Sequence, residues 1–126
     1  MPNKVKIAID VMGGENSPKK VIDGINISLK NNQENFFNLY GKEELIKKEV
    51  SKNKALIKNC EIINTKDIIL DDESPLTAAK RSKDSSMWRA IQSLKDKNSD
   101  ISLSAGNTGA LLVISRLLLN TINGIN

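Results

Sequence analysis

Histidine is absent from this 126-residue sequence, and its absence excludes more chemistry than any other feature of the composition. A chain without histidine has no imidazole general base, no Ser-His-Asp or Cys-His nucleophilic system and no histidine ligand for a metal ion. We therefore expect neither a metal site nor a cofactor. Any reaction at this chain must use other groups.

Cysteine and aromatic residues are scarce as well. A single cysteine, Cys60, excludes a disulfide within the chain and is typical of a protein in the reducing cytoplasm. Because no histidine is present to activate it, Cys60 is expected to be a buried strand residue and not a nucleophile. Aromatic residues make up 3% of the sequence, so isoleucine, leucine and valine must fill the core.

Long hydrophobic runs are missing. The most apolar stretch, 110–119, is interrupted by Ser115 and Arg116 and is shorter than the roughly 20 residues that cross a bilayer as a helix. Residues 1–10 lack the long apolar run and the small-residue cleavage site of a secretory signal. The sequence therefore predicts no membrane span and a cytoplasmic location.

The charge is moderately positive but is not patterned for nucleic acid. The formal net charge is +4 and the sequence pI about 9.2, and lysine supplies nearly all of the positive charge. No basic stretch is interleaved with aromatic residues, as a single-strand-binding surface would require. An acidic protein or a phosphate-bearing ligand fits this charge, and nucleic acid is not expected.

Strand-like and helix-like segments alternate along the chain, whose length is typical of one domain, 1–126. Apolar runs closed by turn residues predict strands at 4–10, 35–40, 60–64 and 101–104. Apolar residues at helical spacing predict helices at 17–30, 43–52, 74–80, 84–94 and 110–119. The alternation indicates an α/β fold, a layered and mostly parallel sheet with flanking helices.

Local signals refine two of these boundaries. Ser17 is predicted to cap the first helix with Pro18 at its first position, and Asp84 or Ser85 is predicted to cap the fourth. The stretch 65–73 stays open between a loop and an irregular strand. Met87 and Trp88 lie on one helical face and are expected to be core or interface residues, not ligand contacts.

Two glycine-rich turns follow predicted strands, at 10–16 and at 104–109. Ligands of an open parallel sheet bind beyond the carboxyl ends of its strands, where such turns gather. In the second turn, glycines let the backbone approach a ligand, and the helix behind it presents N–H groups and a positive dipole end. The anion-site interpretation places these residues around a phosphate: Ser104, Gly106, Asn107, Thr108 and Gly109.

A plainer interpretation of the second turn stays open, in which Asn107 or Thr108 only caps the helix and the glycines ease a tight turn. The turn matches neither the Walker pattern nor GxGxxG. In the first turn, Asp10 orients a substrate or holds a neighbouring backbone N–H group, with Gly13 and Gly14 beside it.

A basic cluster stands ahead of the fourth predicted helix. Lys80, Arg81 and Lys83 precede the polar run 84–86, where an anion or an acidic protein would dock. A solvated loop before a helix cap is the alternative explanation. Lys83 is therefore a candidate anion contact.

Four segments together resemble one family, the acyl-acyl-carrier-protein:phosphate acyltransferases. They are IAIDVMGGENSP at 7–18, LDDE at 70–73, KDSSM at 83–87 and SAGNTGA at 104–110, in the family's order and spacing. The resemblance extends over nearly the whole chain, and the middle part, 36–64, matches mainly in pattern. Glu15 stands where the family usually has aspartate.

The resemblance implies transfer of a fatty acyl group from acyl carrier protein to inorganic phosphate, and the acyl phosphate then serves a membrane glycerol-3-phosphate acyltransferase in phospholipid synthesis. It also implies a fold like that of isocitrate and isopropylmalate dehydrogenases, a cytoplasmic enzyme that sits peripherally at the membrane, and a homodimer. Phosphate is itself the nucleophile in this reaction, so no activated serine, cysteine or histidine is required.

Family members are much longer than 126 residues. We therefore expect an incomplete fold, the N-terminal portion of a single α/β acyltransferase domain, with the principal catalytic residues outside it and unidentified. Two other hypotheses remain. One is a non-catalytic fragment that binds phosphate or another subunit, and the other is a phosphate acetyl- or butyryltransferase that uses coenzyme A.

Overall fold

Strands and helices alternate along the chain. The computed structural model describes residues 4–32, 34–81, 83–122 and 124. The strands are β1 (Lys6–Asp10), β2 (Phe36–Gly41), β3 (Cys60–Asn64) and β4 (Ile101–Ser104). The helices are α1 (Lys19–Asn31), α2 (Glu43–Val50), α3 (Lys54–Lys58), α4 (Pro75–Arg81), α5 (Ser86–Lys95) and α6 (Thr108–Leu118).

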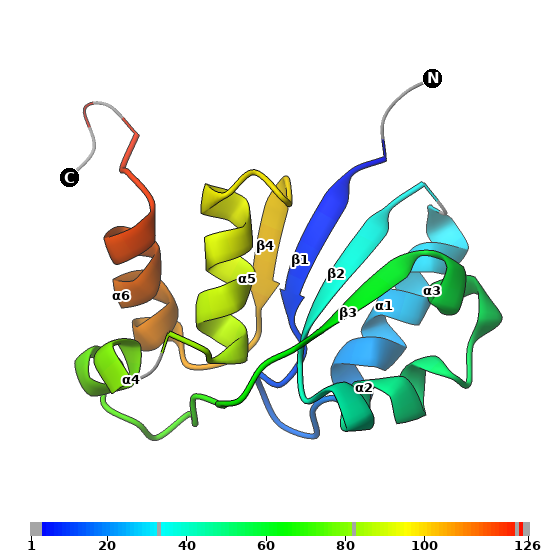
Figure 1. Cartoon of the computed structure of the whole chain (residues 1–126), viewed down its shortest axis with the longest axis horizontal. Helices are drawn as coiled ribbons and strands as arrows, with labels where there is room; N and C mark the ends of the chain where they lie inside the picture. The colour runs from blue at the N-terminus through cyan, green and yellow to red at the C-terminus, as the bar shows by residue number, and fades with distance from the viewer. Residues whose placement is uncertain (1–3, 33, 82, 123, 125–126) are drawn as a thin grey trace.

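The four strands form one parallel sheet in the order β3-β2-β1-β4 (Figure 1). All four therefore end at the same edge, and β1 lies between β2 and β4. This arrangement confirms the predicted α/β fold with a parallel sheet and flanking helices. The likeness to the dehydrogenase fold stays a prediction.

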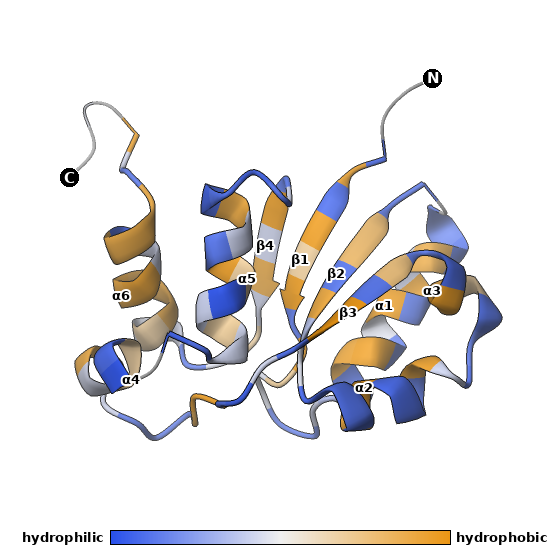
Figure 2. Ribbon diagram, viewed as in Figure 1, coloured by the Kyte–Doolittle hydropathy of each residue, from blue (hydrophilic) through white to orange (hydrophobic). Residues whose placement is uncertain are grey.

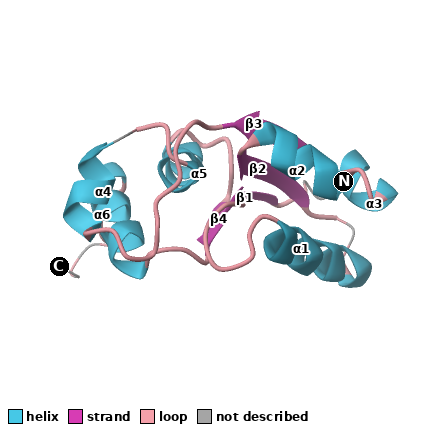
Figure 3. Ribbon diagram, turned by 90° about the horizontal axis from the view of Figure 1, so that it is seen from below, coloured by secondary structure: helices cyan, strands magenta, loops and turns pink. Residues whose placement is uncertain are grey.

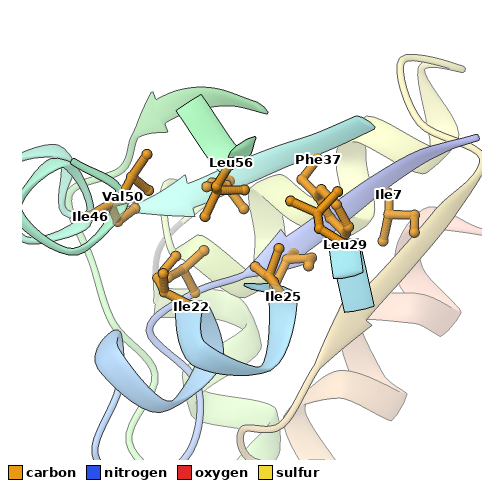
Figure 4. Packing of buried hydrophobic residues seen from close by; sticks show 11 residues of the cluster. Ile7, Ile22, Ile25, Leu29, Phe37, Ile46, Val50 and Leu56 are labelled. Atoms are coloured by element: carbon orange, nitrogen blue, oxygen red, sulfur yellow. The ribbon is translucent and has the colours of Figure 1, made fainter. Parts of the chain in front are cut away.

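One face of the sheet packs against α1, α2 and α3 (Figure 4). Ile7 and Ile9 of β1 point to this face, because alternate residues of a strand point the same way. The helices bring aliphatic side chains at three- and four-residue spacing, as Ile22, Ile25 and Leu29 do in α1. The core is built almost wholly from aliphatic residues, as the composition predicted.

The other face packs against α5, and α4 and α6 lie beyond it (Figure 3). Ala8 and Tyr40 meet Ala90 of α5 in a small cluster. A second apolar cluster joins α4, α5 and α6, with Met87 and Trp88 buried in it as expected. The chain thus leaves β1 toward one face and β4 toward the other, which makes the space between these two strands a topological switch point.

The predicted elements are confirmed within one to three residues at most ends, with two corrections. Ser17 does not cap α1, because its hydroxyl donates to the carbonyl of Gly13, 2.6 Å away, and Pro18 takes the cap position in place of the first helical position predicted for it. The predicted helix 43–52 ends at Val50, and a further short helix, α3, follows it. The open stretch 65–73 is a loop, which touches the start of α5 through one bridge between Asp67 and Ser85.

Of the two residues proposed to cap the fourth predicted helix, Ser85 does so. Its hydroxyl accepts a hydrogen bond from the Trp88 N–H at 3.0 Å. Cys60 is only half-buried, at the amino end of edge strand β3, and burial raises the pKa of its thiol. The raised pKa leaves less thiolate at neutral pH and agrees with the expectation that Cys60 is not a nucleophile.

Hydropathy is uneven over the helices (Figure 2). Helix α6 is apolar around most of its circumference, yet Leu112 and Leu117 are exposed. None of the helices in the described part of the chain combines the length and apolarity that crossing a bilayer requires.

Gly24 in the middle of α1 predicts a stabilising substitution. A Cβ atom built at this position meets nothing within 4 Å, and a helix-interior glycine costs conformational entropy. Gly24→Ala should therefore raise the free energy of unfolding of this chain by about 0.5–1 kcal/mol, measured by urea titration. Gly41→Ala is the contrasting variant, because its Cβ would lie 2.7 Å from the Met12 Cγ. A loss of stability in Gly24→Ala would show that the helix interior does not tolerate a side chain there.

Candidate functional site

The two glycine-rich turns meet at the switch point. Asp10 and Ser104 end β1 and β4 and are direct partners in the parallel register. Beyond them the turns are in contact, because a Cβ atom on Gly13 would lie 2.9 Å from the Gly106 nitrogen. Residues that are far apart in the sequence therefore form one surface at the carboxyl edge of the sheet, as the sequence predicted for ligand-binding turns.

Asp10 holds this junction together. Its carboxylate accepts a hydrogen bond from the Ser104 hydroxyl at 2.8 Å and one from the Met12 N–H at 3.2 Å. The Ser104 hydroxyl in turn accepts from the Gly106 N–H at 3.1 Å. The Asp10 side chain thus holds backbone N–H groups, the second of the two roles that the sequence left open for it.

Burial sets the electrostatics of this carboxylate. Asp10 is 2% exposed, and desolvation raises its pKa above the ordinary value. Hydrogen bonds from Ser86, Ser104 and the backbone of the turn act in the opposite direction but do not cancel the effect of burial. No lysine or arginine among the described residues forms an ion pair with it. The site therefore contains a carboxyl group that is held by neutral donors.

Asn107 caps α6. Its side-chain oxygen accepts from the Ala110 N–H at 3.1 Å, so the plain helix-cap interpretation of this residue is realised. Its amide also donates to the carbonyls of Leu70 and Glu73 at 3.2 and 2.9 Å. One side chain therefore fixes the start of α6 and attaches the loop 70–73 to it. Capping and anion binding are compatible, because the N–H groups of the first helical turn otherwise lack partners within the helix.

The remaining predicted residues differ in their surroundings. Thr108 is exposed at the first position of α6, and Gly14 adopts a φ of 88° that favours glycine. Gly109 is required by packing, because a Cβ there would lie 2.5 Å from the Pro75 Cγ. Lys83 is exposed between α4 and α5, and within the described ranges neither turn forms a hydrogen bond or ion pair with it. The structure therefore does not bring Lys83 to the junction, and Thr108 and Gly109 lie beyond it, at the start of α6.

A cavity of about 610 Å³ opens beside the junction. Both turns line it through Asp10, Gly13, Gly14, Ser104 and Ala105, and the apolar face between α1 and the sheet lines the rest. The cavity also contains residues that sequence reasoning did not select, namely Glu15, Ser17, Lys20 and Asp71. Lys20 is the second residue of α1 and lines the cavity, whereas its neighbour Lys19 pairs with Asp23 at 2.7 Å. Helical spacing places Lys20 on the side of α1 that faces this cavity, a signal that the sequence contained.

Comparison with known proteins identifies the family. The model of the family described as "Fatty acid synthesis protein" matches residues 5–126. The chain belongs to this family. It is 52% identical over its whole length to a phosphate acyltransferase of Pelagibacter ubique, and 42% identical to one of Rhodopseudomonas palustris strain TIE-1. It is also 41% identical, over 97% of its length, to one of Ehrlichia ruminantium. It spans only 36–37% of the length of these relatives and corresponds to their N-terminal part.

Two asparagine caps give a matched test of the role of Asn107. Asn53 caps α3 in the same way, accepting from the Ala55 N–H at 2.9 Å, and has no part in the junction. Asn53→Ala should lower the free energy of unfolding by about 1 kcal/mol, the typical value of a cap. Asn107→Ala should cost about 2–3 kcal/mol, because two loop carbonyls also lose their donor. Equal losses in urea titrations of the two variants would contradict the structural tie to the loop 70–73.

The raised pKa of Asp10 predicts a pH dependence of stability. Between the ordinary and the raised pKa the folded chain binds more protons than the unfolded chain, so folding becomes less favourable as the pH rises through that window. Asp10→Asn should remove this component. The difference in unfolding free energy between the two proteins, measured from low pH to neutrality, should therefore vary with pH in that sense. A constant difference, or one of opposite slope, would show that burial does not control this carboxyl group.

Proposed function

We propose that this chain is the N-terminal, phosphate-proximal part of an enzyme that transfers a fatty acyl group from acyl carrier protein to inorganic phosphate. The observation that supports this best is the contact between the two glycine-rich turns at the switch point, with Gly13 and Gly106 backbone to backbone. Family membership and the printed names of the relatives, phosphate acyltransferase, support the same reaction.

The geometry is suited to an acyl transfer that needs no protein nucleophile. Phosphate attacks the thioester carbonyl, a tetrahedral oxyanion forms, and the carrier's thiolate leaves. The protein has to orient one anion and stabilise a second. The N terminus of α6 supplies N–H groups and a positive dipole end on one side, and Lys20 supplies a positive charge at the cavity.

Asp10 limits how much negative charge the junction accepts. A phosphate beside an ionised, buried carboxylate would be repelled, and a neutral carboxyl group would remove that repulsion. Burial raises the pKa of Asp10, so the protonated form, which does not repel phosphate, forms at a higher pH than in an exposed aspartate. In this proposal Asp10 and Asn107 are positioning residues, since their hydrogen bonds hold the turns while the backbone and lysine contact the anion.

Several features of the complete enzyme are part of the same proposal. They are a single α/β domain of which 1–126 is one portion, a cytoplasmic or peripheral membrane location, a homodimer, and partnership with acyl carrier protein and a membrane glycerol-3-phosphate acyltransferase. Each is carried by the family resemblance. The three relatives compared above are all more than twice as long as this chain, which supports the first feature.

The test uses a protein in which residues 1–126 are followed by the C-terminal remainder of the Pelagibacter ubique relative, which we call the joined chain. Incubated with long-chain acyl-acyl carrier protein and inorganic phosphate, it should form acyl phosphate, which hydroxylamine traps as the hydroxamate. Asn107→Ala should lower kcat/KM for phosphate by about tenfold or more, because the α6 N terminus is displaced. Asn53→Ala is the matched control and should leave kcat/KM unchanged.

Two results would reject this function. If the joined chain forms no hydroxamate, the proposed acyl transfer is rejected. Product from acyl-coenzyme A but not from acyl carrier protein would favour the coenzyme A-dependent alternative. For the chain by itself, inorganic phosphate should raise the unfolding midpoint if the anion site is formed there, and sodium chloride at equal ionic strength should not. A chain without any phosphate-specific shift would be the inert fragment of the alternative hypothesis.

A further inference from the structure

The helix layer on the α1 face stops between β1 and β4. Ile7 pairs with Ile101, and Ile9 with Leu103, so all four side chains point to the same face. The two β1 residues are 9% and 6% exposed, whereas Ile101 and Leu103 are 44% and 52% exposed. This strip of the sheet is apolar but bare, and parallel sheets are normally covered on both faces.

The outer edge of β4 is also open. Within the described part of the chain, β4 pairs with β1 along one edge, and no strand pairs with its other edge. Such an edge presents backbone N–H and C=O groups to a further strand. A bare apolar strip and an open edge thus occur together on one four-residue strand.

Gly24 of α1 lies across the cavity from the exposed Leu103 of β4. It lines the 610 Å³ cavity from the middle of α1, together with Val21, Ile25 and Ser28. Its missing side chain serves no packing purpose among the described residues, since a Cβ there would meet nothing within 4 Å. A helix-interior glycine facing an apolar space is typical of a close approach by another backbone.

We propose that the C-terminal remainder of the protein packs into this groove, which is defined by Gly24, Ile25, Ile101 and Leu103. The remainder places a strand along the open edge of β4 and a helix beside α1. The relatives supply the necessary chain, since 63–64% of their length lies outside the part that matches this segment (100% minus 37% and 36%). A fatty ligand would cover the apolar strip but would leave the strand edge unpaired. The inference rests on the packing and does not depend on the reaction proposed above.

The consequence is that the remainder also closes the candidate site. Gly14 and Ala105 line the same cavity as Gly24, so a segment seated in the groove lies against both turns. The groove is therefore the border at which the two parts of the enzyme meet, and the remainder contributes a wall to the space beside the junction.

Thiol labelling of the joined chain tests this packing without any activity measurement. Cys60 is replaced by serine, and single cysteines are introduced as Leu103→Cys and Ser28→Cys in the walls of the groove and as Lys47→Cys on α2, where the lysine side chain is 64% exposed. Maleimide rates are compared with those of the same proteins in denaturant. The groove cysteines should react at least about tenfold more slowly than in denaturant, and the control on α2 at nearly its denatured rate.

Hydrogen exchange of the joined chain without cysteine substitutions gives a second measurement, in which no substitution can alter the packing. The amides of 101–104 should be protected as strongly as those of 7–10, because both strands would then be internal. Rapid labelling of both groove cysteines, or rapid exchange across 101–104 in a folded joined chain, would overturn the proposal. So would protection that disappears on dilution, which would indicate a second copy, or protection that appears only with added dodecanoate, which would indicate a lipid ligand.

Discussion

The hydrogen bond between the Ser104 hydroxyl and the Asp10 carboxylate is the interaction on which the candidate site depends. It joins the ends of β1 and β4, and the same hydroxyl receives the Gly106 N–H, so the second turn is held through one side chain of the first. Removing water from a carboxylate is unfavourable, and here only neutral donors compensate it. The switch point is therefore held by a buried acid whose pKa is raised by burial and whose charged form is stabilised by neutral donors alone.

Glycine at two positions makes this arrangement sterically feasible. With a side chain on Gly13, atoms of Asp10 and Gly106 would approach within 3 Å, and the turns would have to separate. The requirement for glycine is weaker in the second turn, where a Cβ on Gly106 would lie 3.3 Å from the Gly13 Cα. Asn107 extends the same network outward, since it links α6 to the loop that follows β3. Four segments of the chain are thereby fixed around one small volume.

Most of the fold could be predicted from the sequence, because parallel strands and amphipathic helices leave periodic patterns of apolar residues. Those patterns located β3 and β4 to the residue. They did not reveal α3, a five-residue helix after α2, nor show that the Ser17 hydroxyl donates to the Gly13 carbonyl. The site was predicted in part. The glycine turns were found by their composition, but Asn107 proved to use its side chain fully for capping and loop attachment. Lys20 was missed although its helical spacing from Gly24 and Ser28 placed it on the cavity side of α1, and Asp71 was missed because its position at the cavity arises from tertiary packing.

The order in which the strands occur in the sequence has a consequence for how the junction forms. Ser104 and Asp10 are 94 residues apart, and of the four strands described β4 comes last in the sequence although it belongs beside the first. Strands β1, β2 and β3 can pair as neighbours in sequence, whereas β4 must close a long loop before it gains any contact with β1. Until β4 pairs with β1, the Ser104 hydroxyl cannot donate to Asp10 and the two glycine-rich turns cannot meet. The candidate site is thus assembled only when β4 is in place.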